Sequence, residues 1–196
     1  MSKRFSTTAI LTLVIGLIVI ALIIGFSFTS VFNPSGPVSG VDQAKTLADQ
    51  YASSRGIGLR VKEIMEFSNH YYVMVQEEST GVNAFELLVD KATGRVLLEP
   101  GPSMMWNTKY GHMQWSRNPT ATMPLSSEQA LLNAQEWLDV YFTGARAEEV
   151  ETFYGYYTID FSRDNQTIGM LSVNGYSGEI WYHTWHGQFI EMTEYD

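Results

Sequence analysis

Hydrophobic and polar residues are distributed unevenly along this chain. No charged residue lies between Arg4 and Asp42, and the segment 9–32 is predominantly apolar. About 20 consecutive apolar residues are enough to cross the hydrocarbon core of a membrane as an α-helix. The pattern therefore predicts an N-terminal transmembrane helix at 9–32, preceded by a short basic segment at 1–8.

Two roles fit this apolar segment, a cleaved signal peptide and a retained signal anchor. A signal peptide has a shorter apolar region of about 7–15 residues, followed by small residues at the cleavage site. The run in this chain is longer and no Ala-x-Ala site is evident, which favours the anchor. Because Lys3 and Arg4 precede the segment and no basic residue follows closely, residues 1–8 are expected in the cytoplasm. The expected protein is single-pass in the cell membrane, with an extracytoplasmic C-terminal domain.

Helical periodicity occurs twice in the remainder of the chain. Ser39 is the expected N-cap of the first helix, which ends at Gly56. Ser126 and Gln129 form a capping-box pattern at the start of the second helix, which ends at Gly144. The apolar positions at helical spacing are Val41, Ala44, Leu47, Ala48 and Tyr51 in the first helix and Ala130, Ala134, Trp137, Leu138 and Tyr141 in the second.

Each predicted helix is followed by four segments that are typical of β-strands, with turns between them. The turns carry glycine near their ends, where a positive φ closes a hairpin. The expected strands are Leu59–Phe67, Tyr71–Gln76, Ala84–Val89 and Arg95–Leu98 in the first half and Ala147–Phe153, Tyr156–Phe161, Ile168–Val173 and Glu179–Trp185 in the second.

The two halves also share a sequence motif. The first contains Tyr71-Tyr72 and then Val89-Asp90-x-x-Thr93-Gly94-x-Val96, and the second contains Tyr156-Tyr157 and then Val173-Asn174-x-x-Ser177-Gly178-x-Ile180. Repetition of this kind indicates tandem units with the same fold. A helix that covers one face of an antiparallel sheet is an α+β unit, so the chain is expected to be α+β.

The expected organisation places two such units behind the membrane anchor. A linker that contains Pro and Gly covers 33–40, and the first unit covers 41–113. A second linker covers 114–125, and the second unit covers 126–196. Units of about 70 residues bury little surface alone, so the two are expected to pack together.

The order of helix and strands, the Tyr-Tyr strand and the Val89-Asp90-x-x-Thr93-Gly94-x-Val96 hairpin resemble the PepSY domain family. The second copy departs from this pattern, with Asn174 in place of the acidic residue and Ser177 in place of threonine. PepSY domains occur in propeptides of secreted metallopeptidases, which they restrain, and as membrane-anchored modules without a peptidase. The resemblance implies a non-enzymatic protein that binds or regulates another protein, either a peptidase in trans or partner subunits of an envelope complex.

Composition narrows the choice of partners. Two of the 12 Lys and Arg residues precede the apolar segment, whereas all 21 Asp and Glu residues follow it. This negative charge argues against nucleic acid and anionic lipid headgroups as partners. The chain has no cysteine, which excludes disulfides and thiolate metal sites. Serine hydrolase, phosphate-loop and dinucleotide motifs do not occur in the sequence, so neither catalytic residues nor a cofactor is expected.

Each copy ends in an aromatic-rich segment, Trp106–Gly111 in the first and Tyr182–Gly187 in the second. Aromatic residues dominate core energetics, so packing between the units is the more frequent role. If these residues were exposed, they would form a binding surface for another protein. The candidate protein-binding residues are Trp106, Tyr110, Trp115, Tyr182, Trp185 and Phe189.

Metal binding is the alternative function that the sequence suggests. His183 and His186 lie three residues apart and could bind one metal on one side of a helix or in a loop. In an extended strand such residues point to opposite faces, and a third ligand is not evident. Thioether and imidazole groups suit Cu(I), although methionine is also an ordinary packing residue. The candidate ligands of an extracytoplasmic copper-handling module are Met104, Met105, His112, Met113, His183 and His186.

Overall fold

The computed structural model describes residues 36–112 and 122–195. The chain from Gly36 onward forms one compact unit. Within the described residues, no helix combines the length and the apolar composition that crossing a membrane requires. The transmembrane helix expected at 9–32 and the basic segment at 1–8 lie outside the described residues.

Two similar lobes follow one another along the chain, each with a helix and then four antiparallel strands. Lobe 1 contains α2 (Val41–Arg55), β1 (Leu59–Phe67), β2 (His70–Glu77), β3 (Asn83–Asp90) and β4 (Val96–Leu98). Lobe 2 contains α4 (Ser127–Tyr141), β5 (Arg146–Thr152), β6 (Tyr156–Arg163), β7 (Gln166–Asn174) and β8 (Ile180–Tyr182). A short helix, α3 (Pro102–Met105), follows β4, and a last strand, β9 (Phe189–Glu194), follows β8. The predicted α+β class with antiparallel sheets is confirmed.

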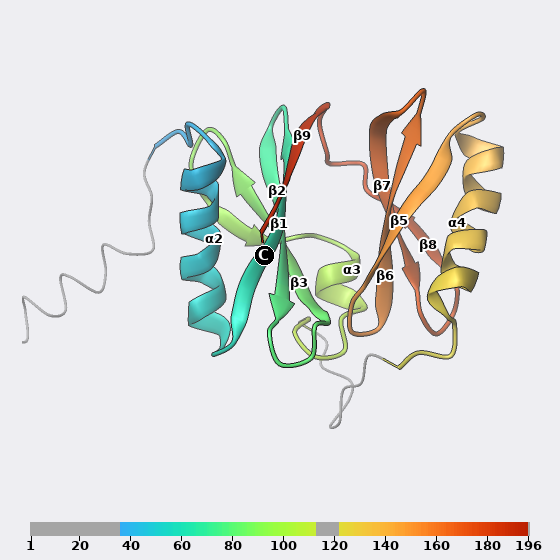
Figure 1. The fold of residues 1–196 in the computed structure, drawn as a ribbon, viewed down its shortest axis with the longest axis horizontal. Coiled ribbons are helices and arrows are strands. Elements are labelled where there is room, and N and C mark those ends of the chain that lie inside the picture. Colours follow the sequence, from blue (N-terminus) through green and yellow to red (C-terminus); the bar gives the residue numbers. More distant parts are fainter. Residues whose placement is uncertain (1–35, 113–121, 196) are drawn as a thin grey trace, which may run out of the picture. The chain divides into compact units, whose positions relative to one another are not determined.

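The lobes stack with their sheets face to face. Figure 1 shows four successive layers, which are α2, the sheet of lobe 1, the sheet of lobe 2 and α4. One apolar cluster fills the space between each helix and its own sheet. A third cluster lies between the two sheets and consists of Met65, Phe67, Tyr72, Met74, Phe153, Tyr156 and Met170. Each sheet therefore buries both of its faces.

Strand β9 does not join the sheet of the lobe that precedes it. The strand orders are β4-β3-β2-β1-β9 and β5-β6-β7-β8, so the last strand crosses to the edge of lobe 1. It pairs antiparallel with β1, from Glu63 opposite Glu194 to Phe67 opposite Phe189. The expected second unit, 126–196, thus differs from the observed lobe 2, because its last segment completes the sheet of lobe 1.

The shared motif forms equivalent hairpin turns in the two lobes. Asp90 accepts hydrogen bonds from the backbone and side chain of Thr93, at 2.8 and 2.6 Å. Asn174 accepts backbone hydrogen bonds from Tyr176 and Ser177, at 2.9 and 3.1 Å. Gly94 and Gly178 follow with φ of 71° and 74°, a conformation that favours glycine. The asparagine and serine of the second copy therefore build the same turn.

The strand register corrects how the two Tyr-Tyr pairs correspond. Tyr71 is opposite Val89, and Tyr157 is opposite Val173. The first tyrosine of copy one therefore matches the second tyrosine of copy two. Both belong to the cluster beneath their own helix, whereas Tyr72 and Tyr156 lie between the sheets.

The two helices begin in different ways. Ser126 and Gln129 form the predicted capping box of α4. The N-cap of α2 is Gly40 without a side-chain hydrogen bond, so the assignment of Ser39 as its cap is wrong. Ser39 instead donates from its hydroxyl to the side chain of Gln43 at an exposed position. Tyr141, expected on the apolar face of α4, is also exposed, because it is the last residue of the helix.

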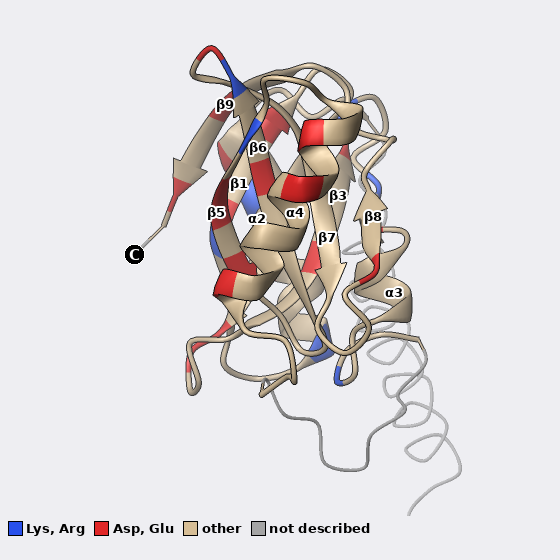
Figure 2. Ribbon diagram, turned by 90° about the vertical axis from the view of Figure 1, so that its right-hand side faces the viewer, with Lys and Arg blue, Asp and Glu red and all other residues tan. Residues whose placement is uncertain are grey.

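Acidic residues lie on the outer side of lobe 2. Figure 2 shows them along α4 and β5, with few basic residues beside them. Those that are exposed to solvent are Glu128, Glu136, Asp139, Glu148 and Glu149. This surface accounts for part of the negative charge of the chain and raises the local concentration of cations.

The difference between the helix caps gives a matched pair of substitutions. Ser126→Ala is expected to lower the free energy of unfolding by about 1 kcal/mol, because it removes an N-cap hydrogen bond. Ser39→Ala is the control and should change it by less than about 0.5 kcal/mol, as is usual at exposed positions. Chemical denaturation of the full-length protein in mild detergent measures both. Equal effects of the two substitutions would contradict the capping assignment.

Candidate functional site

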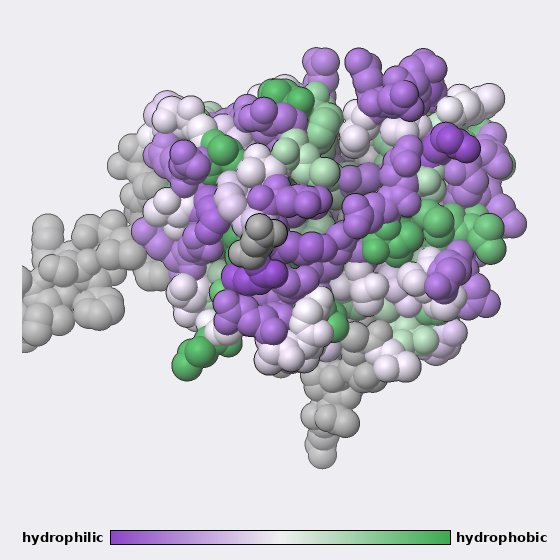
Figure 3. Space-filling view, viewed as in Figure 1, coloured by the Kyte–Doolittle hydropathy of each residue, from purple (hydrophilic) through white to green (hydrophobic). Residues whose placement is uncertain are grey.

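The aromatic candidates for protein binding are half-buried in the structure. Tyr110 packs against the core of lobe 1, Tyr182 against that of lobe 2, and Trp106 and Phe189 against the cluster between the sheets. Trp185 is also half-buried, and Trp115 lies outside the described residues. Figure 3 shows a mainly hydrophilic face on which hydrophobic residues form separate patches. The described aromatic candidates therefore contribute to packing and also keep part of their surface exposed.

The candidate copper ligands occupy different environments. Met104 packs against the core of lobe 1, and Met105 is 48% exposed on α3. His112 is exposed, and Met113 lies outside the described residues. The two remaining candidates, His183 and His186, are buried between the sheets.

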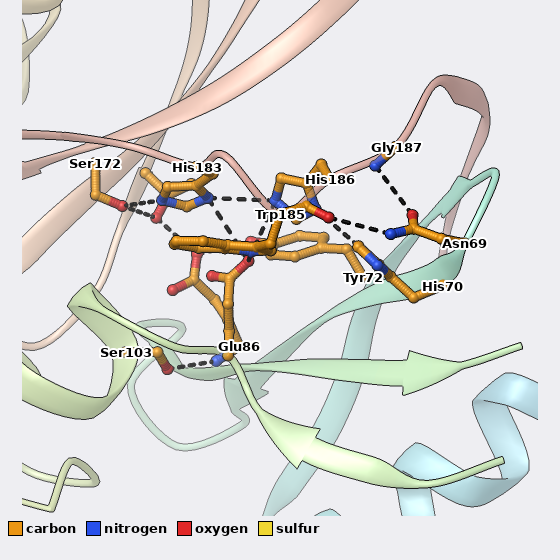
Figure 4. A network of polar contacts seen from close by, with 12 residues as sticks. Asn69, His70, Tyr72, Glu86, Ser103, Ser172, His183, Trp185, His186 and Gly187 are labelled. Carbon is orange, nitrogen blue, oxygen red and sulfur yellow. Dashed lines mark hydrogen bonds and ion pairs between the residues drawn. The ribbon is translucent and has the colours of Figure 1, made fainter. Parts of the chain in front are cut away.

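A group of buried polar side chains surrounds these two histidines. We call it the interlobe centre, and Figure 4 shows most of its members between the sheets. Its members are His70, Glu86, Glu99, Ser172, His183, Trp185 and His186. Glu86 and Glu99 are fully buried, and His70, Ser172 and His183 are at most 6% exposed. The centre combines three imidazoles and two carboxyl groups in an environment that excludes water.

Three hydroxyl groups donate to the carboxyl group of Glu86. They belong to Tyr72 at 2.9 Å, Tyr156 at 2.7 Å and Thr158 at 2.7 Å. Tyr72 comes from lobe 1 and the other two donors come from lobe 2. Hydrogen bonds of this kind stabilise the carboxylate form and hold the two sheets together.

Glu99 faces both histidines of the C-terminal loop through one oxygen. Its Oε1 lies 3.2 Å from His186 Nε2 and 3.6 Å from His183 Nδ1. The two histidine nitrogens are 3.3 Å apart. Trp185 Nε1 donates to the same Oε1 at 3.0 Å, whereas the buried Oε2 has no hydrogen-bond partner among the described residues. Glu99, His183 and His186 are therefore the residues that could hold a metal ion.

The other nitrogen of each histidine is also held in place. His186 Nδ1 lies 2.8 Å from His70 Nε2, and His183 Nε2 lies 3.0 Å from Ser172 Oγ. Phe67 stacks on the ring of His186 with their centroids 4.4 Å apart. These contacts fix the orientation of both rings.

Glu99, His183 and His186 form a triad of possible metal ligands. Glu99 and His183 occupy equivalent positions in the two repeats. Glu99 follows β4 directly, and His183 follows β8 directly. Each also donates its backbone N–H to the preceding hairpin strand, to Glu86 O in lobe 1 and to Met170 O in lobe 2. The stacking of the sheets brings these two strand ends together.

The expected strand Glu179–Trp185 was too long and wrongly included His183. Strand β8 ends at Tyr182, and residues 184 and 185 form a turn. The turn brings the rings of His183 and His186 to a centroid distance of 5.4 Å, so they do not point to opposite faces of a strand. Glu99 was missed because its equivalence to His183 emerges only from the register of the short strands β4 and β8.

The loop that carries His186 is fastened to the turn between β1 and β2. Asn69 donates to Trp185 O at 3.1 Å and accepts from Gly187 N at 3.0 Å. Ser68 Oγ accepts from Gln188 N at 3.1 Å. We call these hydrogen bonds the interlock. Because the neighbouring residue in β2 is His70, the interlock fixes the position of the loop relative to this histidine.

Burial shifts the protonation equilibria of the centre toward uncharged forms. It raises the pKa of Glu99 to about 8, against interactions with Trp185 and with the neighbouring acid Glu86 that lower it. Burial, aided by the charge of Glu99, holds the pKa of Glu86 well above its usual range. Burial also lowers the pKa of His70 and His186 to about 3 and that of His183 well below its usual range. The imidazoles are therefore neutral at physiological pH, with a lone pair on one nitrogen each.

Comparison with known proteins adds little to this description. No protein-family model matches the chain, and no curated protein matches it. The chain is similar to the solved structure of the YpeB C-terminal domain from Bacillus megaterium, at 12% sequence identity and a TM-score of 0.29. The match covers 78% of this chain and 64% of the other, which is less than two thirds. A likeness this low does not establish a shared fold or function.

The interlock predicts a strong effect of a side chain at Gly187. A Cβ there would lie 2.2 Å from Ser68 Oγ and 2.7 Å from Asn69 Oδ1, so the loop would have to move. Gly187→Ala is expected to lower the free energy of unfolding by about 1–3 kcal/mol, as overpacking does. Gly56→Ala is the control, since its Cβ would make an ordinary 3.5 Å contact with Leu59. Chemical denaturation that found both substitutions neutral would contradict this description of the loop.

A second polar contact between the lobes surrounds Glu77, which is buried. Lys109 and Tyr110 donate to its Oε1, and Tyr154 of lobe 2 donates to its Oε2 at 2.6 Å. Burial alone would raise the pKa of Glu77, but these hydrogen bonds lower it from 4.5 to about 2. Tyr110 therefore holds a buried carboxylate instead of presenting a binding surface.

This lowered pKa predicts a pH dependence of stability. Because the folded-state pKa lies below the unfolded value, Glu77 stabilises the fold above about pH 4.5, and this contribution disappears as the pH falls to about 2. Glu77→Gln is expected to lower the free energy of unfolding near pH 7 by about 2–3 kcal/mol and to flatten its decline on acidification. Glu78→Gln is the control, because Glu78 is the neighbouring residue and is exposed. The free energy of unfolding is measured by denaturation between about pH 2 and pH 4.5. If it declined with falling pH as steeply in Glu77→Gln as in the wild type, the assignment would be contradicted.

Proposed function

We propose that this protein is a non-enzymatic binding module of the PepSY type and that its interlobe centre binds a cation. One observation carries this proposal. Two buried carboxyl groups and three neutral imidazoles converge between the lobes, and no ion pair in the described residues joins Glu86 or Glu99 to Lys or Arg.

Charge supports this proposal. Burying a carboxylate without a partner of opposite charge is strongly unfavourable. Three hydroxyl groups donate to Glu86, an arrangement that suits an ionised carboxylate. The neighbouring ionisable group is a second acid, Glu99, rather than a group of opposite charge. A cation between Glu99 and the histidines would favour the ionised form of these carboxyl groups, which burial otherwise disfavours. It would also make the centre a link between the lobes.

Binding of another protein was the first function expected from the sequence, and the structure offers it less support. The five described aromatic candidates are packed, and the Glu77 contacts occupy the hydroxyl of Tyr110. Cation binding was the alternative, and its chemistry now differs from that of copper handling. The centre contains imidazole and carboxylate groups, whereas the two described methionine candidates lie elsewhere, Met104 against the core of lobe 1 and Met105 exposed on α3.

The proposed setting follows from the sequence. The apolar segment at 9–32 would tether the module in the cell membrane, with both lobes outside the cytoplasm. In that setting the module would act as an accessory subunit or as a regulator of a membrane-associated partner. Tethering raises its effective concentration for such partners.

Cation binding predicts stabilisation of the folded state. Full-length protein in mild detergent is stripped with a chelator, and its thermal unfolding is followed after separate additions of Ca²⁺, Mg²⁺, Mn²⁺, Co²⁺ and Zn²⁺. A cation present at about 100 times its Kd adds about 2.7 kcal/mol. This corresponds to an increase in Tm of roughly 5–10 °C for a chain of this size.

Two variants locate the effect. Glu99→Gln should abolish the stabilisation, because it removes the carboxylate that faces both histidines. Glu191→Gln changes an exposed residue of β9 and should respond as the wild type does. If none of the cations raised the Tm of the wild type, the proposed function would be wrong.

A further inference from the structure

We infer that the interlobe centre is a tetrahedral site for a divalent transition metal of the zinc class, with Glu99 Oε1, His183 Nδ1 and His186 Nε2 as its ligand atoms. This inference rests on the proposed function, because it names the cation that the centre binds. It assigns the metal to nitrogen and oxygen donors from both lobes.

The separations of the three ligand atoms fit this coordination geometry. Zn²⁺ lies about 2.0–2.1 Å from imidazole nitrogen, and the edge of a tetrahedron with such bonds measures roughly 3.3–3.4 Å. The three edges in this structure are 3.2, 3.3 and 3.6 Å. A single ion can therefore contact all three atoms with adjustments of a few tenths of an ångström.

An unsatisfied oxygen lies beside the three ligand atoms. Glu99 Oε2 is buried and has no hydrogen-bond partner among the described residues. Because both oxygens belong to one carboxylate, Oε2 lies too close to Oε1 to occupy a separate vertex of the tetrahedron, but it can make a second, longer contact with the ion. A water molecule would take the fourth vertex, as in zinc sites with three protein ligands. An unsatisfied buried oxygen is unfavourable by itself, so a bound ion would remove this penalty.

The contacts around the triad match the outer shell of a metal site. Metal-bound histidine commonly uses its second nitrogen in a hydrogen bond that fixes the ring. Here His186 Nδ1 pairs with His70, and His183 Nε2 pairs with Ser172. Trp185 donates to the carboxylate ligand in the same way. Each of the three ligand residues therefore has a partner that orients it.

The donor set selects among metals. Imidazole and carboxylate suit Zn²⁺ and Co²⁺, whereas Cu(I) prefers the sulfur of Cys and Met. Ca²⁺ requires six to eight oxygen ligands, and Mg²⁺ requires octahedral coordination. Two nitrogens and one carboxylate at tetrahedral separations satisfy neither of these ions. A borderline divalent metal therefore fits the centre better than Cu(I), the metal of the alternative function that the sequence suggested.

The site would tie the C-terminal crossover to lobe 1. Glu99 belongs to lobe 1, whereas His183 and His186 lie in the loop that leads from β8 to β9. A metal ion between them fixes this loop three residues before β9 pairs with β1. Loading of the metal is thus expected to protect the backbone amides of β9 from hydrogen exchange.

Cobalt serves as the spectroscopic probe of the site. Full-length protein in mild detergent is stripped with a chelator and titrated with Co²⁺. Tetrahedral Co²⁺ absorbs visible light intensely, whereas octahedral Co²⁺ absorbs it weakly. The expected result is the tetrahedral spectrum at one Co²⁺ per chain, followed by loss of the spectrum when Zn²⁺ displaces the cobalt.

Variants assign the ligands. Glu99→Gln and His186→Gln are expected to lower the affinity for Zn²⁺ by more than about 100-fold, beyond the range for outer-shell changes. Ser172→Ala, which removes the partner that orients His183 and a contact with Thr158 but no ligand atom, should lower it about 10–100-fold. His112→Gln, at an exposed histidine outside the centre, should leave it unchanged. Circular dichroism of each variant establishes that the fold is retained.

The outcomes separate this inference from the proposed function. An octahedral cobalt spectrum, absence of Co²⁺ and Zn²⁺ binding by the wild type, or loss of binding only in His112→Gln would overturn the inference. If Ca²⁺ or Mg²⁺ nevertheless stabilised the wild type and not Glu99→Gln, the proposed function would stand without the zinc-class site. The cobalt spectrum of the wild type needs no variant, so a substitution that prevents folding leaves the test decisive.

Discussion

Each sheet of this protein has a helix on only one face, and the structure depends on burying the two remaining faces against each other. The cluster between the sheets contains large side chains such as Phe67, Tyr72 and Phe153, which are at most 1% exposed. Separating the lobes would expose these residues to water at about 25 cal/mol per Å² of apolar surface. The lobes are therefore halves of one body, and the crossing of β9 to lobe 1 reinforces this union.

The same burial creates the conditions for the interlobe centre. Polar groups that lie between the sheets lose their hydration and must find partners within the protein. Glu86 finds three hydroxyl donors, and the histidine rings find Ser172, His70 and Glu99. Apolar residues in these places would stabilise the stack at least as well, since buried ionic groups seldom add net stability. The presence of these polar groups agrees with the proposed binding of a cation.

Much of the local structure could be predicted from the sequence. The strand Leu59–Phe67 has the predicted bounds, and the capping box at Ser126 is present, because both follow from nearby residues. The expected transmembrane helix, the PepSY relationship and the partner stay predictions. The crossing of β9 to β1 was not predictable, because pairing between distant strands depends on how the lobes stack. The segment that forms β9 gives little sign of this pairing in the sequence. Most of its residues are exposed, and buried and exposed positions do not alternate along it as they do in a half-buried strand.

The candidate site was harder to predict, for a related reason. Spacing suggested His183 and His186, but the predicted strand ran on to Trp185 and included His183, whereas the observed strand ends at Tyr182. Glu99 has no motif of its own. Its role depends on a contact between two strand ends that are far apart in the sequence. Gly187 was a usable signal in the sequence, because a glycine can mark a loop that lies close to another segment, as this loop does to Ser68.

The repeat explains how one chain can build an asymmetric site. The motif shared by the copies forms turns and core positions, which is why it survives exchanges such as Asp90 to Asn174. The positions that face the other lobe have diverged, with Glu99 in one copy where His183 stands in the other. Stacking then brings unlike residues from equivalent positions together, so that a carboxylate meets an imidazole. Two identical copies would place like groups against each other, and two carboxylates alone would lack the nitrogen donors that a zinc-class metal prefers. The function of this protein is therefore expected to reside in the differences between its repeats.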